Sequence, residues 1–109
     1  ECRVGGADGN PYLAAAAMLS AALEGIRQNL DPGQPVVGNA YDVEDNLQVA
    51  AKFSANLGDA ASALDTSSVA RRYLGDDFVD HFVMSRQWEV REYQRSLNSW
   101  QLERYFEII

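Results

Sequence analysis

The feature that most constrains the fold of this chain is an apolar run from Tyr12 to Leu23, broken only by Ser20. Half of its twelve positions are alanine, so neighbouring backbones can approach it closely. A helix that is apolar on every side is buried as a rule, whereas a surface helix has one apolar stripe. The run is too short to span a bilayer, which takes about 20 apolar residues. The sequence therefore predicts a buried helix in a globular protein, with no membrane partner.

Turn residues on both sides set the bounds of this helix. Asn10 can cap it by accepting hydrogen bonds from backbone N–H groups, and Pro11 is tolerated at the first helical position. Charged and polar residues return after Glu24, and an Asp-Pro-Gly stretch at 31–33 stops the helix. We therefore expect a helix from Pro11 to about Leu30, with its last turns emerging toward solvent.

The second half of the chain is also helical by its pattern. It follows a weakly patterned stretch, 34–57, in which we place no regular element. A short helix is expected over Gly58–Leu64. Thr66 or Ser67 can cap a second one, which ends at Gly75.

Two further helices complete the expected fold. The first starts at Asp76 and Asp77, which complement its dipole. Its continuous face has three- and four-residue spacing and is formed by Val79, Phe82, Val83, Arg86, Val90, Tyr93 and Leu97. Asn98 or Ser99 can cap the last helix. The predicted class is mainly α, with about five helices after a short N-terminal strand end. These amphipathic helices barely suffice to enclose the apolar one, which indicates a piece of something larger.

Charge and cysteine content limit the classes of partner and compartment. Nine basic residues against sixteen acidic ones give a net charge of −7. Nucleic acid is bound through clustered Lys and Arg, and Arg71-Arg72 is the only adjacent basic pair, so we expect no nucleic-acid partner. One cysteine, Cys2, allows no internal disulfide and fits a reducing compartment. No secretory leader pattern is present, and we expect a soluble, cytoplasmic protein.

The strongest chemical candidates are Glu1 and Arg3. On a strand, side chains two residues apart point to the same face, about 7 Å from each other. A carboxylate can hold a divalent cation, and a guanidinium can bind a phosphate or carboxylate through two hydrogen bonds. The pattern E-x-R is common by chance, so on local sequence alone a surface ion pair is the simpler interpretation.

Other candidates have plainer interpretations. His81 has no second His or Cys at metal-ligand spacing and is expected to be a solvated helix residue. Cys2 is expected to be a small, partly buried thiol. The glycine-rich stretch 5–9 lacks both the dinucleotide-binding spacing and the phosphate-binding lysine. The pair Arg71-Arg72 is expected to be a solvated helix face. The aromatic residues of the second half are expected to be core or interface residues: Trp88, Tyr93, Trp100, Tyr105 and Phe106.

The opening of the chain, taken as a whole, is more specific than its parts. E-x-R-x-x-G-A-D-G-N-P-Y-L, followed by an alanine-rich helix that ends in E-G-I, resembles the glutamine synthetase family. The stretches LGDDFV at 74–79 and WQLERYFEII at 100–109 are similar to one branch of it, the γ-glutamylpolyamine synthetases and related glutamylating enzymes. The resemblance covers the chain from Glu1 to Ile109.

This resemblance implies a place in a larger fold. Residues 1–109 would be the C-terminal helical portion of the α+β catalytic domain, comprising its last active-site strand and the helices after it. The N-terminal β-grasp domain and the rest of the catalytic domain would be absent from it. The family forms large rings, so the full-length form is expected to be a homo-oligomeric ring.

The resemblance also implies an activity and two site residues. The family uses ATP to activate the γ-carboxylate of glutamate as γ-glutamyl phosphate, which ammonia or an amine then attacks. Glu1 matches a ligand of Mg²⁺ or Mn²⁺, and Arg3 matches a catalytic, substrate-binding arginine that faces the glutamate substrate and the transferred phosphoryl group. No residue here is assigned to ATP. Asn10 and Tyr12 are interpreted as cap and packing residues.

Two alternatives remain open at this point. The chain is either part of an ATP-dependent glutamate–amine ligase, inactive by itself, or a free-standing helical module for interaction or assembly without catalysis. For the ligase, the choice between ammonia, a polyamine and another amine is not readable from these residues.

Overall fold

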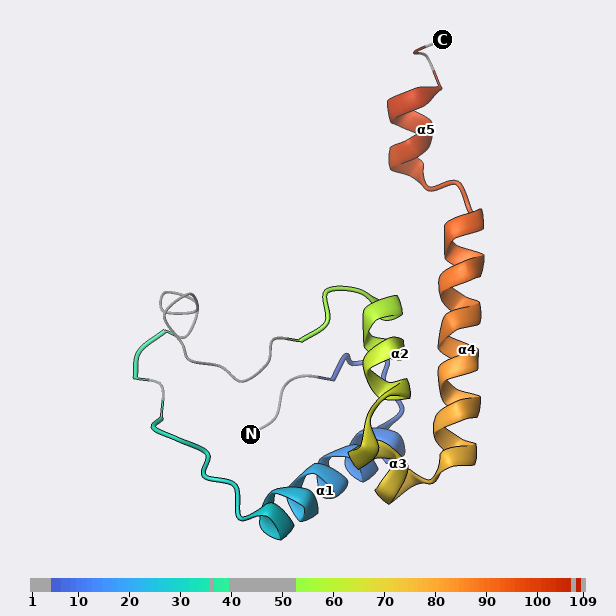
Figure 1. Ribbon diagram of the computed structural model, residues 1–109. Coiled ribbons are helices and arrows are strands. Elements are labelled where there is room, and N and C mark those ends of the chain that lie inside the picture. The colour runs from blue at the N-terminus through green and yellow to red at the C-terminus, as the bar shows by residue number, and fades with distance from the viewer. Residues whose placement is uncertain (1–4, 36, 40–52, 107, 109) are drawn as a thin grey trace. The chain divides into compact units, whose positions relative to one another are not determined.

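A computed structural model of the protein describes residues 5–35, 37–39, 53–106 and 108, which form five helices (Figure 1). The helices are α1 (Pro11–Gln28), α2 (Leu57–Asp65), α3 (Ser68–Leu74), α4 (Asp76–Arg95) and α5 (Ser99–Tyr105). The described residues contain no strand, and the mainly α class is confirmed. The predicted strand end, 1–4, lies outside them. The chain divides into two units, 1–53 and 54–109, which are described separately.

Both ends of α1 are capped by asparagine. The Asn10 side-chain oxygen accepts hydrogen bonds from the backbone N–H groups of Tyr12 and Leu13 at 3.0 and 3.2 Å. At the other end Asn29 adopts the left-handed conformation, with φ 51° and ψ 45°, and the N–H of Leu30 bonds the Gly25 carbonyl at 3.0 Å. This is the usual hydrogen-bond pattern of a left-handed helix end. The predicted start is confirmed, whereas the helix ends two residues before Leu30.

The prediction that α1 is buried is wrong for the described residues. All of its large apolar side chains except Leu13 are exposed, with exposed fractions of 84% for Tyr12, 62% for Leu19 and 78% for Ile26. The alanines that surround them are small and bring little apolar area of their own. An all-round apolar helix needs covering surfaces on several sides, and the described residues do not supply them. The apolar pattern thus identified the helix correctly, but not what covers it.

Glu24 is the one buried residue of α1, at 6% exposure. Arg27 donates from Nε to Oε2 at 2.8 Å and from Nη2 to Oε1 at 2.7 Å, which makes a two-bond contact. The Gln28 amide adds a third hydrogen bond to Oε1 at 2.5 Å. A buried carboxylate is costly unless it is paired and hydrogen-bonded, and neighbours one turn away on the same helix meet that need.

The second unit is organised by α4, against which α2 and α3 pack (Figure 1). Its core is small: Ala61 of α2 and Val79 and Val83 of α4 are at most 3% exposed. Gly58 of α2 lies near Val90 of α4, because a Cβ at position 58 would be 4.0 Å from Val90 Cγ1, an ordinary contact. The predicted apolar face of α4 is therefore confirmed at its first turns.

Truncation in this core tests the packing. Val79→Ala is expected to lower the free energy of unfolding by about 2 kcal/mol, because it removes fully buried methyl groups and leaves a cavity. Urea unfolding followed by helical circular dichroism measures the change. Val37→Ala is the matched control, since Val37 is 88% exposed and the same truncation there should cost less than about 0.5 kcal/mol. Equal losses in both variants would contradict the assigned core.

Three helices of the second unit, α2, α3 and α5, begin at a side-chain cap. Helix α2 starts at Leu57, one residue before the predicted start. Its cap, Asn56, accepts from the Asp59 N–H at 2.9 Å and donates to the Asp59 carboxylate at 2.8 Å. Ser67, rather than Thr66, caps α3. Asn98 caps α5, and its N–H and side chain exchange hydrogen bonds with Gln101 at 3.1 and 2.9 Å.

Gly75 joins α3 to α4. Its φ of 84° lies in the left-handed region, which other residues adopt with strain, and its N–H bonds the Arg71 carbonyl at 3.0 Å. The Gly75 carbonyl then accepts from Val79 at 3.1 Å, the first bond of α4. No side chain caps α4, but Asp76 and Asp77 occupy its first turn and complement its dipole. The predicted ending of α3 at Gly75 is confirmed.

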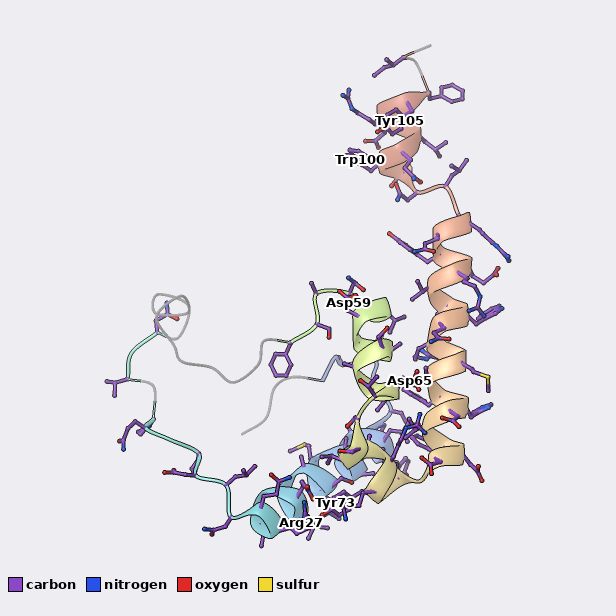
Figure 2. All side chains as sticks on the ribbon, viewed as in Figure 1. Arg27, Asp59, Asp65, Tyr73, Trp100 and Tyr105 are labelled. Atoms are coloured by element: carbon purple, nitrogen blue, oxygen red, sulfur yellow. The ribbon has the colours of Figure 1, made fainter. Side chains whose placement is uncertain are left out.

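Beyond the core, the second half of α4 and all of α5 expose large apolar side chains. Trp100 and Tyr105 both project from α5 (Figure 2). Their rings are arranged edge to face, with 6.0 Å between the ring centroids. The exposed fractions lie between 53% and 78% for Trp88, Tyr93, Trp100, Tyr105 and Phe106. Of the prediction that these are core or interface residues, the core part is therefore wrong within the described residues, and the interface part stays a prediction. In that same part of the chain, no helix is both long and apolar enough to cross a membrane.

Candidate functional site

Glu1 and Arg3, the two predicted site residues, lie outside the described residues. The structure describes the loop 5–10, directly after them in the chain, and its connection to α1. In this loop the N–H of Gly9 bonds the Gly6 carbonyl at 3.0 Å and closes a tight turn. A Cβ at position 9 would lie 3.1 Å from the Gly6 carbonyl oxygen, closer than an ordinary contact. Glycine at position 9 thus permits the turn that leads directly into the helix cap.

Asn10 is the cap predicted for this junction, and Tyr12 is not the packing residue predicted beside it. Asn10 satisfies two backbone donors at the start of α1, while the Tyr12 side chain is 84% exposed. The turn and the cap together fix the direction in which the chain enters the helix. Any site on the residues before Gly5 is therefore attached to α1 through a short connection with defined hydrogen bonds.

Removal of this cap has a measurable effect on α1. Asn10→Ala is expected to destabilise the start of the helix by about 1 kcal/mol, because two backbone N–H groups lose their acceptor. Faster amide hydrogen exchange over the first turn of α1 would report the loss. Asn10→Asp is the control, since an aspartate can cap equally well and suits the positive end of the dipole. Identical exchange in both variants would contradict this role for the side chain.

Arg71 is the centre of a charged cluster in the second unit. It donates from Nε to the Asp65 carbonyl at 3.0 Å and from Nη2 to the Asp65 carboxylate at 2.9 Å. Its Nη1 contacts the carboxylates of Asp76 and Asp80 at 2.9 and 2.8 Å. Hydrogen bonds with Asp76, and to a lesser extent with Asp80, raise the pKa of Arg71 above its ordinary value, because they favour the charged form.

This cluster corrects the prediction for the arginine pair. Arg71 is not simply a solvated residue: its side chain is 29% exposed and ties the end of α2 to the start of α4. Arg72 beside it is exposed, as predicted. Asp65 is the last residue of α2, and Asp76 and Asp80 lie on α4, so no local motif indicates the cluster. Its arrangement is structural, and every group in it is engaged in holding helices together.

The described residues do not form a metal centre. Among them, no group of three or more His, Cys, Asp or Glu side chains is placed to hold a metal ion. His81 is exposed on α4, as expected for a solvated helix residue, and the neighbouring Asp80 contacts Arg71. Cys2 lies outside the described residues. Glu1, the predicted metal ligand, also lies outside the described residues, and its role stays a prediction.

Comparison with known proteins identifies the class. Residues 1–105 match the family model for the catalytic domain of glutamine synthetase. The match takes in the opening motif, the loop, α1 and the four later helices. The chain therefore belongs to the glutamine synthetase family, as part of the catalytic domain, and the resemblance drawn from its sequence is confirmed.

Individual relatives are named both as glutamine synthetases and as ligases that join glutamate to an amine. The chain is 42% identical over its whole length to type-1 glutamine synthetase 2 of Dictyostelium discoideum, of which it covers 21%. It is 40% identical, again over its whole length, to a glutamate–isopropylamine ligase of a Pseudomonas species, of which it covers 23%. Over 98% of its length it is 35% identical to a γ-glutamylethanolamide synthetase of Streptomyces coelicolor, of which it covers 22%. The chain thus spans about a fifth of the length of these relatives.

Proposed function

We propose that residues 1–109 are the C-terminal portion of the catalytic domain of an ATP-dependent ligase. This ligase joins ammonia or an amine to the γ-carboxylate of glutamate through γ-glutamyl phosphate. The observation that carries the proposal is the match of residues 1–105 to the glutamine synthetase catalytic domain, together with relatives named as glutamine synthetases and as glutamate–amine ligases. We further propose that the full-length ligase contains the remainder of the catalytic domain and an N-terminal β-grasp domain.

Glu1 is proposed as one ligand of Mg²⁺ or Mn²⁺. A carboxylate oxygen is the kind of ligand that these cations prefer, and Mg²⁺ takes six oxygen ligands in an octahedral arrangement, from carboxylates, phosphates and water. One carboxylate is a fraction of that set, and the described residues add no cluster to it. The other ligands are therefore expected from parts of the ligase outside this chain. When bound, the cation neutralises charge on the phosphate oxygens during transfer.

Arg3 is proposed as the residue that orients glutamate and the phosphoryl group. Its guanidinium is permanently charged, and its planar fork can donate two parallel hydrogen bonds to a carboxylate or phosphate. Phosphoryl transfer depends mostly on positioning and on stabilisation of charge, both of which such a group supplies.

An activity assay tests the proposal. The full-length ligase, given glutamate, ATP, Mg²⁺ and either ammonia or a panel of alkylamines, ethanolamine and polyamines, should release ADP and form a γ-glutamyl amide. The amine that gives the highest rate would identify the substrate of this ligase. Residues 100–109 favour the amine-glutamylating branch, and they do so by similarity alone. Absence of ADP release with every amine would instead support a helical assembly module without catalysis.

The isolated chain serves as the matched negative case. Residues 1–109 alone are expected to give no ATP-dependent γ-glutamyl transfer, since one carboxylate and one arginine cannot hold two metal ions and a nucleotide. Mass spectrometry of the reaction mixture measures the γ-glutamyl product. Product formed by these 109 residues would contradict the proposed division of the site.

A further inference from the structure

We draw no further inference here: the strongest candidate, the exposed apolar surface of α4 and α5 around Trp88, Tyr93 and Trp100, supports no proposal because nothing in the described part of the chain shows what covers it.

Discussion

Replacing Glu1 with alanine in the full-length ligase is expected to reduce the turnover number by at least about a hundredfold. The reason is the loss of a metal-ligating oxygen, since even partners that only support a ligand cost about 10- to 100-fold when they are removed. The reduction should be accompanied by a higher Mg²⁺ or Mn²⁺ concentration for half-maximal rate. A metal titration of ADP release measures both quantities in one experiment.

The matched control for this variant is Glu89→Ala. Glu89 lies on α4 with a half-exposed side chain, and its nearest ionic contact, Arg86, is at a long 3.9 Å. The same substitution there should leave turnover and metal dependence unchanged. Wild-type turnover and metal affinity in Glu1→Ala would show that the assignment of Glu1 is wrong. A loss of turnover in Glu89→Ala as well would indicate a folding defect and remove the support for a metal-specific effect.

The second large effect is expected for Arg3→Lys. Lysine keeps the charge but not the planar fork, so two parallel hydrogen bonds to a carboxylate or phosphate cannot form. We expect kcat/KM for glutamate to fall on the order of a hundredfold, a loss typical of removing one preorganised donor from a transition state. Steady-state kinetics with glutamate as the varied substrate measure this quantity.

Arg91→Lys is the control for Arg3→Lys, because Arg91 lies on an exposed position of α4. Its kcat/KM should remain at the wild-type value. If Arg3→Lys also retained wild-type kcat/KM, charge alone would account for the role of the residue and the proposed two-bond contact would be wrong. A fall in kcat/KM that comes only from a higher KM, with kcat unchanged, would assign Arg3 to substrate binding without a part in phosphoryl transfer.

The local parts of the fold were predictable from sequence because short-range chemistry determines them. Asn10 with Pro11, Ser67 and Gly75 mark helix ends through hydrogen bonds or backbone conformations that involve only near neighbours. The exact end of α1 was not predictable, since Asn29 could continue a helix or adopt the left-handed conformation. Sequence pattern places such ends to within a few residues.

Features that join separate elements were not predictable in the same way. Arg71 finds its carboxylates at positions 65, 76 and 80, and their proximity depends on how α2, α3 and α4 pack. The apolar pattern of α1 likewise indicates that other parts of the protein should cover the helix. It does not indicate which surface covers it. For the candidate site, the pattern E-x-R alone did not indicate a family. The fixed spacing from E-x-R to the residues Asn10 to Leu13 is what made the resemblance to the glutamine synthetase family specific. The roles of Glu1 and Arg3 stay predictions.

The shortness of α5 has a consequence for its motions. Its capping box satisfies the first turn, yet a helix of seven residues has too few hydrogen bonds to offset the entropy of nucleation by itself. Its large side chains, Trp100 and Tyr105 among them, are mostly exposed in this chain. Fraying of α5 should therefore be rapid wherever those side chains remain in water. In a Trp88→Phe variant, Trp100 is the one tryptophan of the 109 residues, and its indole fluorescence then offers a local optical signal for the moment at which this end of the chain becomes ordered.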